Sequence, residues 1–179
     1  MVFLCIAFIG LALTAVAIFT PGWRHYKYQG GPYYGLITYT CGSGNHLVNG
    51  ENCDHWWKDK QTWERAVIVL MLAALLFEIV IFFTFLATFC KSFQAFIPLS
   101  FLAFIATILL LISIILYGAK SNSKIAYIPA ASGELNANHD LGYSYWLAVT
   151  STIIMAIATV FGIVLSAIPS RRPPLLITN

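Results

Sequence analysis

The residues of this 179-residue chain that could carry chemistry are few, and the clearest group is a pair of cysteines. Cys41 and Cys53 share one polar segment, and His46 and His55 lie close to them in the sequence. Such cysteines can form a disulfide in the secretory pathway or contribute to a metal site. Because neither a CxxC motif nor the paired histidine spacing of a zinc site is present, we expect a disulfide and no metal.

The second candidate is Glu78, an acid inside a long apolar run. It lies 13 residues beyond Arg65, about 20 Å along a helix, and therefore near the middle of a bilayer. A carboxyl group at that depth is a candidate for ion or proton transport. In the structural alternative the acid is protonated, or it hydrogen-bonds a hydroxyl group of a neighbouring helix, such as that of Thr107, Ser113, Thr152 or Thr159. We favour the structural alternative because the sequence offers no second intramembrane charge for a relay.

Other patterns give no support for catalysis. The chain has no HExxH motif, no paired acids inside an apolar run and no phosphate-binding glycine motif. The four histidines are scattered through polar segments and are most simply solvated or hydrogen-bonded. We therefore expect that the protein is not an enzyme and uses no cofactor. Nucleic acid binding is excluded as well, because Lys and Arg form no run and no stripe interleaved with aromatic residues.

The composition identifies the elements that must hold these residues. Hydrophobic residues make up 59% of the chain and charged residues only 9%, and the mean hydropathy is +0.79. Soluble domains have roughly a quarter of their residues charged, so lipid must cover much of this apolar surface. Four membrane helices of about 20 residues would use about 80 residues and leave room for two loops and a tail. The predicted fold class is mainly α, an integral membrane protein with a four-helix transmembrane bundle.

Four apolar runs are long enough to be these helices, and together they predict a single domain. The predicted spans are residues 2–20, 66–90, 96–117 and 145–168, the loops are residues 21–65 and 118–144, and the tail is residues 169–179. The first run could also be a signal peptide, but no basic segment precedes it, so we expect a retained helix. The short link after the second run predicts an antiparallel pair, and four spans place both termini on one side.

The side of the membrane follows from the cysteines rather than from the basic residues. Seven of the ten Lys and Arg residues lie in the two loops opposite the termini, which by raw count contradicts the positive-inside rule. Six acids accompany those seven, whereas Lys91, Arg171 and Arg172 have no acid near them. Because disulfides form in the secretory pathway, we expect the cysteine-bearing loop to be extracellular and both termini cytoplasmic.

The first loop is predicted to be folded rather than flexible. Residues 23–28 and 33–41 are dense in aromatic and β-branched residues, which favours two strands joined by a Gly-Gly-Pro turn. The disulfide would close a hairpin and stabilise it by about 3 kcal/mol. Residues 54–65 predict a helix with Trp56 and Trp63 on one face, at the level of the lipid headgroups. The second loop shows little periodicity.

Small residues recur at four-residue spacing in two of the predicted spans. Ala158, Gly162 and Ser166 share one face of the fourth span, and Gly10 and Thr14 share one face of the first. Such faces let helix backbones approach closely, either inside one bundle or between two copies. Packing inside the bundle is the simpler interpretation.

The first loop also carries an ordered set of residues: a tryptophan, a Gly-Leu pair, two cysteines and an arginine at the start of the second span. In this chain they are Trp23, Gly35, Leu36, Cys41, Cys53 and Arg65. With four spans, this order resembles the claudin and peripheral myelin protein superfamily. Ile37 stands where the family usually has a second tryptophan, and the spacings from Gly35 to Cys41 and between the cysteines are slightly wide. The resemblance is to a divergent member.

The resemblance implies a left-handed four-helix bundle with a small extracellular antiparallel β-sheet, here stapled by the disulfide. It also implies that Asp54 faces the paracellular pore, as in channel-forming claudins, where a carboxylate attracts cations. The alternative for Asp54 is a solvated acid that caps the following helix. Cys90, beside Lys91 at the cytoplasmic edge, is a candidate for palmitoylation, because claudins are often acylated here, and the alternative is an inert thiol.

Three classes of function remain. The first is a claudin-like protein of plasma-membrane cell junctions that binds like molecules in cis or trans and shapes paracellular permeability. The second is an accessory subunit packed against an ion channel, and the weakest is a small transporter that uses Glu78. The first is favoured because the first loop is short, unlike that of the channel-regulating branch. Asn179 lacks the apolar side chain that a PDZ scaffold needs, so the expected partners are lipid and other membrane proteins.

Overall fold

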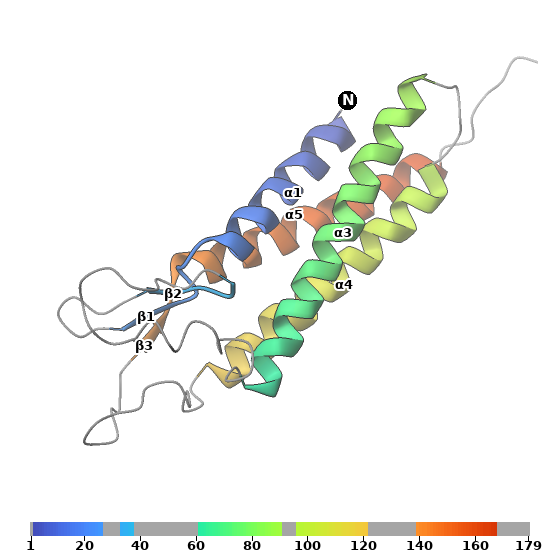
Figure 1. Ribbon diagram of the computed structural model, residues 1–179. Helices are drawn as coiled ribbons and strands as arrows, with labels where there is room; N and C mark the ends of the chain where they lie inside the picture. The colour runs from blue at the N-terminus through green and yellow to red at the C-terminus, as the bar shows by residue number, and fades with distance from the viewer. Residues whose placement is uncertain (1, 27–32, 38–60, 91–95, 122–138, 168–179) are drawn as a thin grey trace, which may run out of the picture.

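Four helices dominate the part of the chain that the computed structural model describes, which is residues 2–26, 33–37, 61–90, 96–121 and 139–167 (Figure 1). The helices are α1 (Val2–Phe19), α3 (Thr62–Cys90), α4 (Phe96–Lys120) and α5 (Tyr143–Ala167). Each contains a stretch that is long and apolar enough to cross a membrane. The mainly α, four-helix part of the predicted fold class is therefore confirmed.

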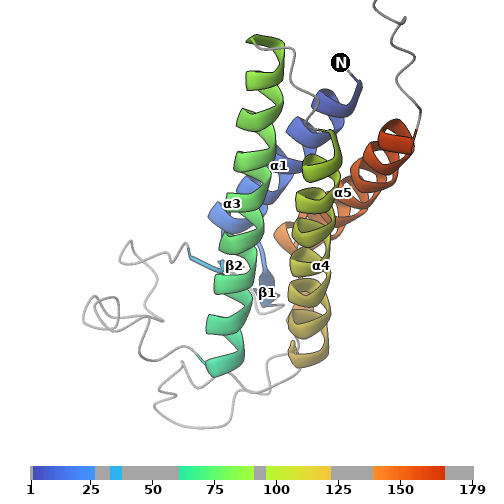
Figure 2. The ribbon, with the colours of Figure 1, turned by 90° about the vertical axis from the view of Figure 1, so that its right-hand side faces the viewer.

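The four helices form a closed ring in which each contacts two neighbours. α1 packs on α3 and α5, and α4 packs on the same two helices from the opposite side. The start of α1, the end of α3 and the end of α5 lie at one end of the bundle, as two perpendicular views show (Figures 1 and 2). The opposite end holds the start of α3 and the strands. Large apolar side chains cover the outside, where lipid would meet them, and Leu76, Phe83 and Phe101 are 63%, 63% and 64% exposed.

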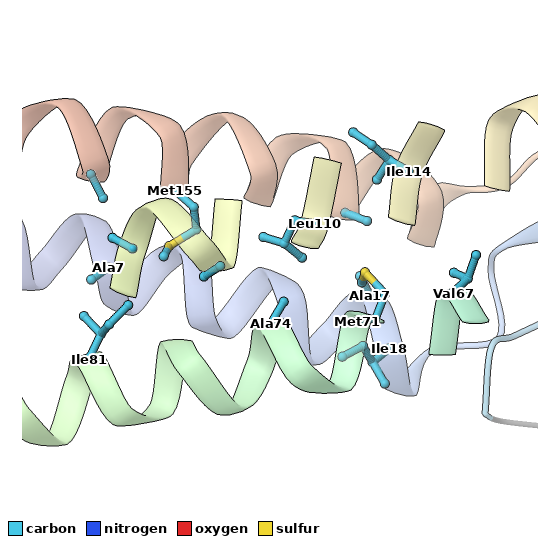
Figure 3. Packing of buried hydrophobic residues seen from close by; sticks show 14 of the residues in the cluster. Ala7, Ala17, Ile18, Val67, Met71, Ala74, Ile81, Leu110, Ile114 and Met155 are labelled. Atoms are coloured by element: carbon cyan, nitrogen blue, oxygen red, sulfur yellow. The ribbon is translucent and has the colours of Figure 1, made fainter. Parts of the chain in front are cut away.

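Small side chains line the contacts inside the ring. Ala17, Ala74 and Met155 are fully buried between the helices (Figure 3). A Cβ atom at Gly10 would lie 2.7 Å from Met155 Sδ, and one at Gly162 would lie 2.7 Å from Ser100 Oγ. Both glycines therefore serve close packing within the bundle. Ser166, in contrast, is exposed.

A three-stranded antiparallel sheet caps one end of the bundle. β1 (Arg24–Tyr26) is its central strand, and β2 (Tyr33–Tyr34) and β3 (His139–Leu141) flank it. Arg24 pairs with Tyr34 on one side and with Leu141 on the other. β1 and β2 lie within the two segments of the first loop predicted to be strands, whereas β3 lies in the second loop, whose sequence shows little periodicity. The sheet therefore joins the two loops, although they are far apart in the sequence.

The structure describes residues 61–65 of the helix expected over residues 54–65, and α3 begins within them. Gln61 is not helical, and its backbone N–H donates to Glu64 Oε2 at 3.3 Å. Arg65 N in turn donates to Gln61 O at 3.1 Å, the first hydrogen bond of the helix. The bond from Gln61 N to the Glu64 side chain is one half of a capping box, and it satisfies the N–H group directly before the first helical residue, Thr62. Trp56 lies outside the described residues.

Candidate functional site

Trp23 attaches the sheet to the helical bundle. Its side chain is fully buried, and its indole Nε1 donates to the carbonyl oxygen of Ala17, near the end of α1, at 2.6 Å. The ring meets Tyr117 of α4 edge-on at a centroid distance of 4.7 Å and Tyr145 of α5 at 6.2 Å. One side chain at the entrance to β1 therefore contacts three helices.

Leu36, also named by the sequence motif, lies in the same core. It is 3% exposed, and Ile37 packs against the core as a partly buried residue. Gly35 is half-buried. The Gly-Leu pair thus contributes one apolar side chain to the core, and Ile37 packs against that core.

The second loop returns to this region through a close backbone contact. Gly142 N donates to Trp23 O at 3.0 Å, and Ser144 N donates to Gly22 O at 2.9 Å. The Ser144 side chain adds a hydrogen bond from Gly22 N at 3.0 Å. A Cβ atom at Gly142 would collide with the carbonyl oxygen of Gly22, so only glycine fits there. The two loops are therefore joined by main-chain hydrogen bonds as well as by the strands.

The family model for tight junction proteins of the claudin-like type matches residues 1–171. The chain belongs to the claudin-like family. This confirms the resemblance that Trp23, Leu36 and their neighbours in the sequence indicated. The family and the four apolar helices together make the chain a multi-pass membrane protein of a junction type, a class that interacts with other membrane proteins. A search of curated proteins gave no significant match.

Arg24 is the residue of this claudin-like site that sequence reasoning missed. It is 1% exposed, its Nε donates to Tyr117 Oη at 3.0 Å, and its guanidinium carbon lies 5.2 Å from the Trp63 ring centroid and 5.3 Å from that of Tyr117. Both distances are within the range of cation–π attraction. Nη1 and Nη2 donate to no residue in the described part. In the sequence, Arg24 is one of several charged residues of the first loop, and no local pattern distinguishes it from an arginine exposed to solvent.

Trp63 contributes to the same cluster in this claudin-like structure, and its level relative to the lipid headgroups remains a prediction. It is half-buried in the first turn of α3, and its ring contacts Tyr117 at a centroid distance of 5.7 Å. Arg65 lies in the same turn and is also half-buried. The first turn of α3 therefore completes the aromatic cluster around Arg24.

Glu78 occupies a second polar site, in the middle of the bundle. It is 2% exposed, and its Oε1 lies at hydrogen-bond distance, 3.0 Å, from Thr14 Oγ1 of α1. Thr14 Oγ1 lies 2.6 Å from Ser151 Oγ of α5, which donates to Gly10 O at 2.9 Å. Three helices are thus linked by consecutive polar contacts, which we call the Glu78 chain.

The hydroxyl groups named from the sequence as partners of Glu78 bond elsewhere. Ser113, Thr152 and Thr159 each donate to the carbonyl oxygen four residues earlier in their own helix. Thr107 also bonds to the preceding turn and lies 3.2 Å from the hydroxyl oxygen of Thr159. The hydrogen-bond partner of Glu78 is therefore Thr14, which was not among the hydroxyl groups named from the sequence. The choice depends on which helices are neighbours, and the sequence does not contain that information locally.

The remaining predicted sites have no described side-chain geometry. Cys41, Cys53 and Asp54 lie outside the described residues, and Cys90 is the last residue of α3. Within the described part, no three or more His, Cys, Asp and Glu residues gather as a metal site requires. The disulfide, the pore position and the acylation site remain predictions.

Proposed function

We propose that this chain is a junction protein of the plasma membrane that acts through its two extracellular loops and through lateral contacts with other membrane proteins. The observation that supports it is the attachment of both loops to one base. β1 of the first loop pairs with β3 of the second, and Trp23 fastens β1 to three helices. A base of this kind presents loops in a fixed relation, as binding to a facing surface requires. Family membership supports the same function.

The proposal includes an orientation. The sheet-bearing end is extracellular, because the cysteine-bearing loop belongs to it, and both termini are cytoplasmic. Lys91 follows α3 at the opposite end, and Arg171 and Arg172 follow α5. The orientation is tested by adding protease to intact cells that express the protein with a cleavable tag either in the second loop or at the N-terminus. We expect cleavage of the tag in the second loop and protection of the tag at the N-terminus.

The junction role is tested by mixing two cell populations that lack junctions of their own. Both express the protein, each with a different fluorescent tag, and untagged parental cells are added. We expect enrichment at borders between two expressing cells and not at borders with parental cells. Uniform surface distribution would overturn the junction role, and a channel subunit that co-purifies in mild detergent would then support the accessory-subunit function.

Asp54 is the proposed determinant of permeability. Its alternative role is that of a helix cap, but the residue directly before α3 is Gln61, whose backbone N–H donates to Glu64 Oε2, so Asp54 does not occupy the cap position of α3. A carboxylate beside a narrow water path attracts cations and repels anions. Asp54→Lys should therefore lower the ratio of sodium to chloride permeability across a cell layer, with unchanged surface abundance.

The matched control for this test is Asp59→Lys, which makes the same charge change at another acid of the first loop. We expect Asp59→Lys to leave the ratio close to that of the unmodified protein. If both variants reach the surface and change the ratio equally, the effect comes from loop charge in general, and the specific role of Asp54 is wrong.

A further inference from the structure

The Glu78 chain contains more contacts than its hydroxyl groups can supply with protons. It has three oxygen–oxygen contacts, from Glu78 to Thr14, from Thr14 to Ser151 and from Ser151 to the Gly10 carbonyl. Each hydrogen bond needs one proton, and a hydroxyl group has one to give. The two hydroxyl groups therefore account for two hydrogen bonds. With an ionised carboxylate, one of three buried contacts would place two acceptors against each other.

The surroundings give an ionised Glu78 no compensation. Its second oxygen, Oε2, is buried and accepts no hydrogen bond within the described part. α1 and α5 contain no acidic or basic residue. Apart from Glu78, the charged residues of α3 are Glu64 and Arg65 in its first turns. The charged residue of α4 is Lys120, at its end. The other titratable groups described in these helices lie toward helix ends, at Cys5, Cys90, Tyr117, Tyr143 and Tyr145. An unpaired buried charge is costly, whereas a neutral carbonyl oxygen without a partner costs far less.

We propose that Glu78 is a proton-binding site in which the proton acts as a structural ligand joining α1, α3 and α5. The neutral acid donates from Oε1 to Thr14, Thr14 donates to Ser151, and Ser151 donates to the Gly10 carbonyl. The donor and acceptor of the first contact are then reversed relative to an ionised carboxylate, and every contact has its own proton. No hydroxyl group must serve two acceptors.

Infrared spectroscopy of the full-length protein at neutral pH, in a detergent that has no ester or carboxyl group, tests the proposal directly. A protonated carboxyl group gives a carbonyl band distinct from those of carboxylates, and acids in water are ionised at this pH. We expect the band in the unmodified protein and in Glu64→Gln, and its loss in Glu78→Gln. A folded protein without the band, or a band that persists in Glu78→Gln, would overturn the proposal.

The direction of donation is tested at Thr14. Thr14→Val removes the acceptor and should shift the carbonyl band of Glu78 to higher frequency, whereas Thr14→Ser keeps the hydroxyl group and should leave the band in place. An unshifted band in folded Thr14→Val would contradict donation from Glu78 to Thr14.

A pH series decides the question even if Thr14→Val fails to fold. The folded state binds one proton that the unfolded chain, with Glu78 in water, releases at neutral pH. Stability must then fall as pH rises, with the folding constant decreasing about tenfold per pH unit until the folded state also loses its proton. Glu78→Gln should lack this dependence, because its amide can donate to Thr14 at every pH. Identical pH slopes for the two proteins in mixed micelles would overturn the proposal.

Discussion

Trp23 and Arg24 are neighbours in the sequence. Both are buried where the sheet meets the helical bundle, and they make different kinds of contact. Trp23 fills space and satisfies one carbonyl of α1, whereas Arg24 brings a charge between the rings of Trp63 and Tyr117. The only hydrogen bond from the Arg24 side chain within the described residues runs from Nε to Tyr117 Oη. Among the described residues, the charge of Arg24 is therefore stabilised by the hydroxyl group of Tyr117 and by the ring faces of Trp63 and Tyr117.

The dependence of Arg24 on Tyr117 can be measured. Tyr117→Phe keeps the ring and removes the hydrogen-bond acceptor, so it should destabilise the protein by about 1–3 kcal/mol, the cost of a buried polar group without its partner. Arg24→Met removes the group that needs the partner, and Tyr117→Phe should then cost clearly less. Thermal unfolding in detergent of the four proteins forms a double-mutant cycle, and additive effects would show that the contact carries no coupling.

Arg65 is predicted to be structural, because it lies half-buried in the capped first turn of α3 beside the aromatic cluster. Arg65→Ala should lower surface delivery and the unfolding temperature. Surface biotinylation and thermal unfolding measure the two effects. A variant that reaches the surface normally and loses only partner binding would place Arg65 in an interface instead.

At the scale of elements, the short strand β3 makes the second loop part of the same platform as the first. It spans three residues, and its continuation is fixed by Gly142, whose amide bonds Trp23 O. The contact leaves no space for a side chain at Gly142. The joint between the two loops therefore depends on one missing Cβ atom.

Gly142→Ala should separate β3 from β1, because the added Cβ atom meets the Gly22 carbonyl, which is backbone and cannot rotate away. We expect a loss of about 1–3 kcal/mol, in the range of overpacked buried sites. Hydrogen exchange at residues 24–26 should become faster, as should exchange at 139–141. The control is Gly118→Ala, where the added atom meets the hydroxyl end of the Tyr145 side chain and not backbone. Unchanged exchange in folded Gly142→Ala would contradict the joint.

The elements were predictable to different extents for physical reasons. Helices in lipid need only length and apolar composition, so the four apolar helices could be read from the sequence. The first turn of α3 falls within the helix predicted over residues 54–65, but its starting residue was not predicted, because it depends on the contact between Gln61 N and Glu64 Oε2. β3 is too short to show an alternating pattern. The burial of Arg24 and the pairing of Glu78 with Thr14 depend on residues from distant elements, which local sequence cannot identify.

At the scale of the whole molecule, the ring of helices places the sheet at one end and the start of α1 with the ends of α3 and α5 at the other (Figure 1). The first loop, which contains both cysteines in the sequence, follows α1 and precedes α3, and its described strands β1 and β2 lie at the sheet-bearing end. If that end is extracellular, an oxidised pair follows, and the cysteines then report on the orientation of the entire chain.

Mass mapping of unreduced peptides should find Cys41 linked to Cys53, and reduction should lower the unfolding temperature, since the closed loop is worth about 3 kcal/mol in the chain-entropy model. A Cys41→Ser/Cys53→Ser variant should be unaffected by reductant. Two free thiols in protein purified from the cell surface would contradict both the pairing and the orientation.

The central position of β1 in the sheet has a consequence for the order of biosynthesis. β1 leaves the ribosome early, but its partner β3 and the helix that supplies Tyr145 come last in the chain. Until α5 is inserted, Trp23 and Arg24 lack part of their surroundings, and the first loop cannot complete its sheet. Chains that end before β3 would therefore leave β1 without one partner strand and Trp23 without the ring of Tyr145. We expect the quality-control machinery of the endoplasmic reticulum to retain and degrade such chains, so that no shortened protein reaches the cell surface.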